Sequence, residues 1–297
     1  MTDFNSFEYE RMIGDLIRDT FYFERSKRGK ISGIRQFSEI LVRKILNVGS
    51  DRRLMLGTIQ RDFKSELDGL QENRKEDLLE IIERIRPLGN DGTHTQHTEE
   101  FSDDDLDQVK DGLLDLYAYL FIDYFLKYPM NLLSPAEVMF NFSLLPPIVR
   151  YKTLKYLYEM DANLQIANRY CLSIIKTYDK EIALKWLEEE STKLLSISYP
   201  TDTEIEEYIN KRGVEDGSGN IVINLALPNY NNVYSLLKDK IENPRTSVNE
   251  SGKMYSKFEE AKSYWLSNRS SSDQLEVEEL NELIDFVYLG RNINKKR

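Results

Sequence analysis

The chain has 297 residues, of which 40% are hydrophobic and 31% are charged, and its formal net charge is −11. These values are normal for a folded globular protein, and the length allows one large domain or two of ordinary size. The acidic balance argues against a chain built for non-specific phosphate binding, because contact with DNA or RNA needs clustered Lys and Arg.

The sequence carries no sign of secretion or of membrane insertion. Residues 1–10 are acidic and polar, which argues against a signal peptide. The most apolar run, residues 113–128, is interrupted by Asp115 and Asp123 and is too short to cross a bilayer. The single cysteine, Cys171, lies among apolar neighbours and is predicted to be a core residue. We therefore expect a cytoplasmic protein without membrane contact.

The net charge hides an asymmetry along the chain. Between Arg11 and Arg61 there are twelve Lys/Arg against five Asp/Glu, whereas between Glu99 and Asp123 there are nine Asp/Glu against one Lys. The basic face and the acidic helix could complement each other within one bundle, or each could complement a second copy or a partner.

Helical periodicity begins near the N-terminus. A first helix is predicted from Ser6 into the basic stretch that follows it, and a second from about Ile31. On the second helix Arg35, Glu39 and Arg43 are spaced four apart, so their charges can pair along one face.

Two longer helices follow. One is predicted to begin at Asn73 with a capping box, and Pro87 is predicted to end it. Gly89 and Gly92 are then expected to form a tight turn. The next helix opens at Ser102, because the acidic residues after it suit the positive end of a helix dipole.

The remainder is also predicted to be helical, with one exception. Asp216–Asn220 followed by the apolar run 221–225 indicates a small β-hairpin. The fold class is thus mainly α, and we expect two domains, a four-helix bundle over residues 1–130 and a mainly helical domain over residues 131–297.

The stretch from Arg84 to His94 is the most site-like part of the chain. The only two histidines, His94 and His97, lie within one turn of each other and close to Arg84 and Arg86. Histidine is the default general acid or base near neutral pH, and arginine offers a fixed fork for a phosphate. Such a set would suit phosphodiester cleavage without a metal ion.

A purely structural interpretation stands beside this one. Gly89-Asn90-Asp91-Gly92 is typical of any tight turn between helices, and Asn90 could simply cap the next segment. A His94/His97 metal site is weakly indicated, because no third ligand has a defined position. No nucleotide-binding, metalloprotease or hydrolase motif is present, so no metal and no cofactor is predicted.

The pattern Arg86-x-x-Gly89-Asn90-x-x-x-His94, between an amphipathic helix and an Asp-rich helix start, resembles an uncharacterised bacterial domain family. That family occurs alone and at the N-terminus of type I restriction enzyme motor subunits. It is similar to the HEPN helical bundles of prokaryotic toxins and defence systems. The resemblance covers about residues 1–130, and the helical Arg35-x-x-x-Glu39 also fits it.

The resemblance implies a four-helix bundle that commonly dimerises. In catalytic HEPN proteins an arginine and a histidine of each copy meet across the interface as a metal-independent ribonuclease site. By motif position Arg86 and His94 are the catalytic candidates here. The candidate binding residues are Arg84, Asn90, His97, Arg35 and Arg43.

We therefore expect a component of a prokaryotic defence system that acts through a protein partner or through its own dimerisation. A metal-independent endoribonuclease that uses the Arg/His pair on RNA is the alternative. A second alternative is nucleic-acid binding through the basic face between Arg11 and Arg61.

Overall fold

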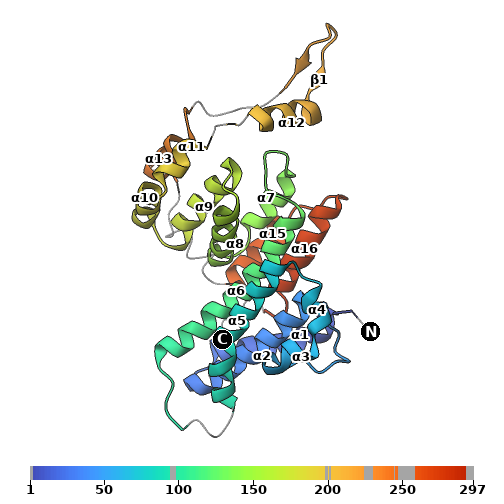
Figure 1. Ribbon diagram of the computed structural model, residues 1–297, viewed down its shortest axis with the longest axis vertical. Helices are drawn as coiled ribbons and strands as arrows, with labels where there is room; N and C mark the ends of the chain where they lie inside the picture. The colour runs from blue at the N-terminus through green and yellow to red at the C-terminus, as the bar shows by residue number, and fades with distance from the viewer. Residues whose placement is uncertain are drawn as a thin grey trace. The chain divides into compact units, whose positions relative to one another are not determined.

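The computed structural model describes residues 3–93, 98–197, 200, 202–223, 230–243, 245–246 and 258–291, with the side chains of residues 72 and 212 excepted. These residues are mainly helical, and they include one two-stranded antiparallel sheet (Figure 1). The predicted fold class, mainly α with one small β-hairpin, is confirmed. No helix in the described ranges has the length and apolar character needed to cross a membrane.

The chain divides into two compact units, and the first is discontinuous in sequence. Unit 1 comprises Met1–Phe121 and Glu282–Arg297, and unit 2 comprises Ile122–Asn281. The division falls inside two helices, α6 and α16, whereas the sequence placed a domain boundary at residues 130/131.

Unit 1 is built on long helices joined by short ones. Its elements are α1 (Ser6–Ile17), η1 (Arg18–Tyr22), α2 (Lys27–Ile45), η2 (Leu56–Thr58), α3 (Ile59–Asp62), α4 (Lys64–Asp68), α5 (Glu72–Thr93) and the first part of α6 (Asp103–Lys127). The second helix therefore begins at Lys27, earlier than predicted, because the side chain of Ser26 accepts a hydrogen bond from the backbone N–H of Gly29 and caps it. The π-helical turn η1 and the short helices α3 and α4 were not predicted.

The core of unit 1 follows the predicted apolar stripes. Ile34, Phe37 and Leu41 of α2 are buried, as are Val109 and Leu116 of α6. Helix α2 packs on α5. The periodicity of apolar residues thus identified the buried faces correctly.

The C-terminal segment belongs to unit 1 because of a close backbone contact. Gly290, with φ at 68°, follows α16 (Leu275–Val287) and lies against Gly14 of α1. A Cβ added at Gly290 would lie 2.5 Å from the backbone nitrogen of Gly14. Arg291, which follows, is buried, and its Nε donates to the carbonyl oxygen of Val287.

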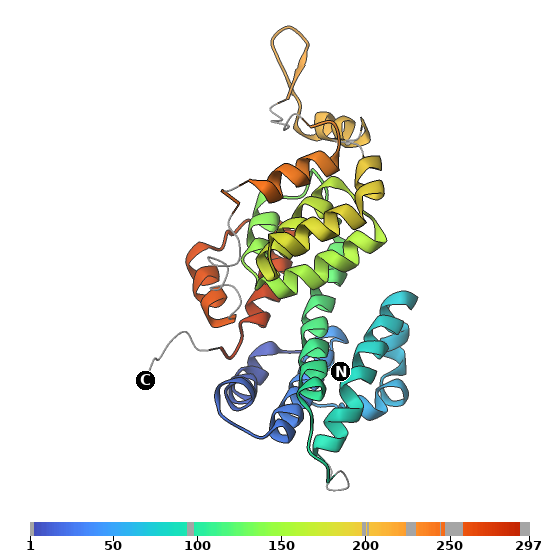
Figure 2. The same ribbon diagram turned by 90° about the vertical axis from the view of Figure 1, so that its left-hand side faces the viewer.

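Unit 2 is a set of shorter helices with the hairpin. Its elements are the end of α6, α7 (Ala136–Ser143), α8 (Pro147–Met160), α9 (Leu164–Thr177), α10 (Lys180–Glu189), α11 (Ser191–Ser196), α12 (Asp202–Arg212), β1 (Val214–Glu215), β2 (Ile221–Val222), α13 (Val233–Glu242), α15 (Phe258–Asn268) and the first part of α16. Helices α8 and α9 lie side by side in both ribbon views (Figures 1 and 2). Strands β1 and β2 pair Val214 with Val222 and Glu215 with Ile221, and Gly219 in their turn has φ at 84°.

Cys171 lies in α9 and is fully buried. Burial raises the pKa of its thiol to about 12. A thiol that remains protonated in an apolar environment is a poor nucleophile, so the prediction that Cys171 is a core residue is confirmed.

Candidate functional site

The stretch expected to form a turn after Pro87 is helical. Helix α5 continues through Pro87 as far as Thr93, so the prediction that Pro87 ends the helix is wrong. Proline in a helix interior removes one backbone hydrogen bond, and tertiary contacts must offset that loss. One tertiary contact and one hydrogen bond within the helix hold the last turns of α5. A guanidinium nitrogen of Arg28 donates to the carbonyl oxygen of Asp91 at 2.8 Å, and the hydroxyl of Thr93 donates to the carbonyl oxygen of Gly89.

Gly89 and Gly92 are therefore helical residues, and their assignment to a turn is wrong as well. Both lie where α5 passes close to α2. A Cβ at Gly89 would lie 2.5 Å from Cδ of Arg35, and a Cβ at Gly92 would lie 3.2 Å from Cγ2 of Ile31. The glycines serve the close approach of two helices, which a side chain at either position would obstruct.

The helical conformation places part of the motif on one face. Arg86, Asn90 and Thr93 follow one another at four- and three-residue intervals, so they line the same side of α5. Arg86 donates to a carboxylate oxygen of Glu83, one turn earlier, at 2.7 Å. The other catalytic candidate, His94, lies outside the described residues, as does His97. The Arg86/His94 pair accordingly remains a prediction.

The two candidates on α2 have different roles. Arg35 and Glu39 form the expected pair, with 3.5 Å between a guanidinium nitrogen and a carboxylate oxygen, and Arg35 also donates to the hydroxyl of Thr93. Burial raises the pKa of Glu39, although the neighbouring Arg35 lowers it. Arg43 instead donates to two carbonyl oxygens of the following loop, those of Gly49 and Arg52, each at 2.8 Å. Its guanidinium thus fixes the loop after α2.

Arg84 is engaged with the acidic helix. It donates to Asp115 of α6 at 2.6 Å, and a second guanidinium nitrogen lies 3.6 Å from Asp111. At the start of α6, Asp103 lies 3.0 Å from the ammonium group of Lys27. The basic segments and the acidic helix therefore neutralise each other at these points within one unit.

Much of the basic segment between Arg11 and Arg61 is also neutralised by carboxylates of the same unit. Ion pairs within the unit join Arg18 to Asp15 and Asp19, Arg25 to Asp19, Arg52 to Glu66 and Arg61 to Asp62. These pairs reduce the positive potential that a phosphate backbone would require, so the charge count of the sequence overstates the basic character of this face.

Four structural features were not identified from the sequence. The first is a run of aromatic residues at the end of η1, where Phe21, Tyr22 and Phe23 are 41%, 56% and 53% exposed. In the sequence these aromatic residues continue the apolar spacing of the first helix, which indicates a buried helix face. The π-helical turn, which the sequence did not reveal, changes that spacing. Phe7 and Met12 of α1 are also exposed.

The second feature is a cavity of about 270 Å³ in unit 2, lined by aromatic rings from three helices. Its aromatic lining comprises Tyr151 of α8, Tyr170 and Tyr178 at α9, and Trp186 of α10. We call it the aromatic cup. No sequence signal could have revealed it, because the four rings come from separate segments and only the packing of α8, α9 and α10 brings them together.

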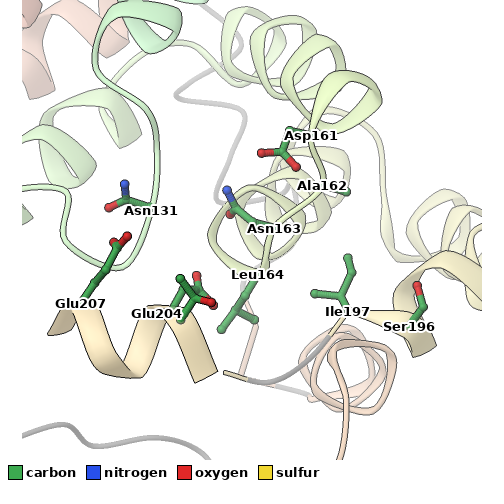
Figure 3. Close-up of a pocket in the computed structure, with 10 residues that line it drawn as sticks. Asn131, Asp161, Ala162, Asn163, Leu164, Ser196, Ile197, Glu204 and Glu207 are labelled. Atoms are coloured by element: carbon green, nitrogen blue, oxygen red, sulfur yellow. The ribbon is translucent and has the colours of Figure 1, made fainter. Parts of the chain in front are cut away.

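The third feature is a hollow of about 400 Å³ between the start of α9 and α12. Asp161, Glu204 and Glu207 contribute carboxylates to its lining, and Glu207 points toward Asn131 (Figure 3). Asn163 is used structurally, since its side chain caps α9 and donates to the carbonyl oxygen of Met130. Across the part of the chain that the structure describes, no group of His, Cys, Asp and Glu has metal-binding geometry. The lining of the hollow is thus partly acidic.

The fourth feature is a buried arginine in unit 1. Arg74 of α5 is 3% exposed, donates to Asp77 at 2.8 Å and stacks on Tyr119 of α6, with 3.6 Å from its guanidinium carbon to the ring centroid. The hydroxyl of Tyr119 in turn donates to the carbonyl oxygen of Arg74. This reciprocal contact binds α5 to α6, and we assign it a structural role.

Comparison of the chain with protein-family models, with curated proteins and with solved structures found no match.

Proposed function

We propose that unit 1 is a protein-binding module of a prokaryotic defence system, and that it binds a second copy of itself. The HEPN-like resemblance of residues 1–130 supports this function, since such bundles commonly dimerise. The observation that carries the proposal is the exposure of the three consecutive aromatic residues Phe21–Phe23 at a π-helical turn. Turns of this kind occur frequently at functional sites, and aromatic residues dominate the energetics of protein interfaces.

The charges around this run suit a symmetric contact. Charged residues of both signs lie next to it in the sequence and form ion pairs with one another, namely Asp15, Arg18, Asp19 and Arg25. A two-fold interface brings the same patch together from both copies, so the patch must be complementary to itself. An apolar centre with both signs of charge at its edge meets that requirement.

Sizing at several concentrations tests the proposal. The wild-type chain should show a monomer–dimer equilibrium, and the double variant Tyr22→Ser/Phe23→Ser should dimerise at least about tenfold more weakly. The matched control is Phe140→Ser in unit 2, where a phenylalanine of 43% exposure lies outside the patch. A wild-type chain that is monomeric at every concentration, or a double variant that dimerises normally, contradicts the proposal.

A metal-independent endoribonuclease is the second candidate, and one observation favours it. The Nε atoms of Arg35 and Arg86 are buried and have no hydrogen-bond partner among the described residues. Both guanidinium groups therefore retain donor capacity, and Arg35 donates to the hydroxyl of Thr93, which lies on the same side of α5 as Arg86. In this role Arg86 would hold a scissile phosphate and His94 would transfer the proton.

Cleavage of RNA in the presence of a chelator tests this candidate. We expect Arg86→Ala and His94→Ala each to reduce cleavage by about a hundredfold or more, in keeping with the loss of a general acid–base or a phosphate clamp. Arg61→Ala, at an exposed arginine outside the motif, is the control and should cleave normally. Full activity in both motif variants contradicts the assignment.

A further inference from the structure

The aromatic cup of unit 2 has walls at right angles to its floor. Tyr151 and Tyr170 form the floor, with ring centroids 5.7 Å apart and planes inclined by 29°. Tyr178 stands at 88° to Tyr151, and Trp186 stands at 78° to Tyr170. A flat ligand such as a nucleobase could stack on one of these planes only. A rounded group can contact several ring faces at once.

The cup differs in accessibility from floor to wall. Tyr170 is 5% exposed and belongs to the core, whereas Tyr178 is 40% exposed and Ile182 at the rim is 43% exposed. The cup is thus open to solvent on one side and has a floor fixed by packing. Such preorganisation reduces the entropy lost when a ligand binds.

The ring faces are the part of the cup that can attract a positively charged group. Burial at the floor, the largest cause, raises the pKa of the Tyr170 hydroxyl, so that hydroxyl carries no charge near neutral pH. The lining includes one acid, Glu189, and one base, Lys185, which is exposed and lies 3.8 Å from Glu189. These two opposite charges offset each other, so the negative faces of the aromatic rings supply the attraction for a cation.

A ring next to the cup, that of Tyr158, carries a lysine ammonium group, which also donates to the carbonyl oxygen of Tyr158 at 3.0 Å. Nζ of Lys193 lies 4.2 Å from the centroid of the Tyr158 ring. Tyr158 in turn contacts Tyr170 at 5.3 Å and Trp186 at 5.5 Å between centroids. The rings of the cup therefore belong to one aromatic cluster, and a ring of that cluster outside the cup already has a cation–π contact.

From this arrangement we infer that the aromatic cup binds an organic cation that presents a methylated ammonium group. Tyr and Trp faces attract such a group through their quadrupoles, and its methyl groups fill a rounded, apolar space better than a hydrated ammonium does. The inference concerns unit 2 and is independent of the function proposed for unit 1.

Calorimetric titration of the full chain with choline tests the inference. The comparison ligand is its uncharged isostere, in which a tert-butyl group replaces the trimethylammonium group. Choline should bind saturably, and the isostere should bind about tenfold more weakly, because it keeps the shape and loses the charge. Equal binding of the two ligands, tighter binding of adenosine, or no saturable binding of choline each overturns the inference.

Variants at the walls locate the site. Tyr178→Ala and Trp186→Ala should each weaken choline binding by at least about fivefold. The matched control is Tyr264→Ala, since Tyr264 is 37% exposed, similar to Tyr178, and lies outside the cup lining. Because Tyr178 is 40% exposed and lies outside the buried core, its variant is expected to fold normally, which a thermal unfolding curve verifies. Unchanged binding in Tyr178→Ala places the ligand elsewhere and overturns the inference.

Discussion

The arginines of α2 and α5 and the aromatic cup of α8, α9 and α10 differ in how much of their binding capacity the fold itself uses. Arg35, Arg84 and Arg86 each have a carboxylate partner within the same unit. In the second, the rings pack on one another at the floor and leave a cavity at the walls.

The difference shows that residue types with obvious chemistry are a weak guide to a site. The charge of an arginine that is paired within its own unit is partly neutralised by the carboxylate. An anionic ligand must therefore compete with that carboxylate for the guanidinium group. An aromatic ring that is packed on one face keeps the other available. Four predictions probe this comparison.

The largest effect is expected inside the cup. Tyr170→Ala should lower the free energy of unfolding by about 3–5 kcal/mol, because it removes a buried ring that three other rings contact. Tyr178→Ala should lower it by about 1 kcal/mol or less, because Tyr178 is 40% exposed. Urea unfolding measures both values. Similar losses in the two variants contradict the distinction between floor and wall.

The second prediction concerns the crossing of α2 and α5. Gly89→Ala should destabilise the protein by about 1–2 kcal/mol, since the new Cβ would overlap the Arg35 side chain and the better helix propensity of alanine offsets only part of that cost. Gly57→Ala is the control, because nothing lies within 4 Å of a Cβ at Gly57. Stabilisation by Gly89→Ala in the same unfolding experiment argues against the close crossing.

The third prediction concerns the pairing of the basic and acidic segments. A double-mutant cycle on Arg84→Ala and Asp115→Ala should give a coupling energy of roughly 0.5–1 kcal/mol, because Asp115 is partly shielded from water. The more exposed pair Arg18–Asp15 should couple less strongly and lose more of its coupling in high salt. A coupling energy near zero at Arg84–Asp115 leaves that arginine available to a ligand.

The smallest effect is a pH dependence at Glu39. Burial raises the pKa of this carboxyl in the folded protein above its ordinary value of 4.5, so the folded state binds its proton more tightly than the unfolded state does. This contribution of Glu39 to the free energy of unfolding is fully present below the pKa of the carboxyl in the unfolded state. It is lost as the pH rises through the pKa of the carboxyl in the folded state. Wild type should therefore gain stability relative to Glu39→Gln as the pH falls from 7 toward 4.5. The opposite trend in paired unfolding curves shows that Arg35 outweighs burial.

Local sequence patterns predicted much of unit 1 because the signals involved are local. The apolar stripe of α2 and the acidic start of α6 both mark elements that the structure contains. Amphipathic spacing identifies which face is buried, since a helix must cover its apolar side whatever it packs against. The turn of the β-hairpin was predicted for a similar reason, because Asp216 and Gly219 suit a tight turn in any context.

Pro87 and Gly89 show where local reasoning failed. Both residues favour the end of a helix in isolation, yet α5 continues through them. A contact with Arg28, distant in sequence, supports the last turns, and the absence of a side chain at Gly89 allows α2 to approach. Propensity is a weak prior, and tertiary packing of a few kcal/mol overrides it.

The sequence by itself determined the helical character and the buried faces of the helices. Only the tertiary structure decided three features. Arg84 donates to Asp115 of α6, Gly89 allows α2 and α5 to approach each other, and four rings from α8, α9 and α10 line a cavity. The physical reason is the range of the interactions. Helix formation and amphipathicity act over one or two turns, whereas an ion pair between helices or a cup between them exists only after distant segments have packed.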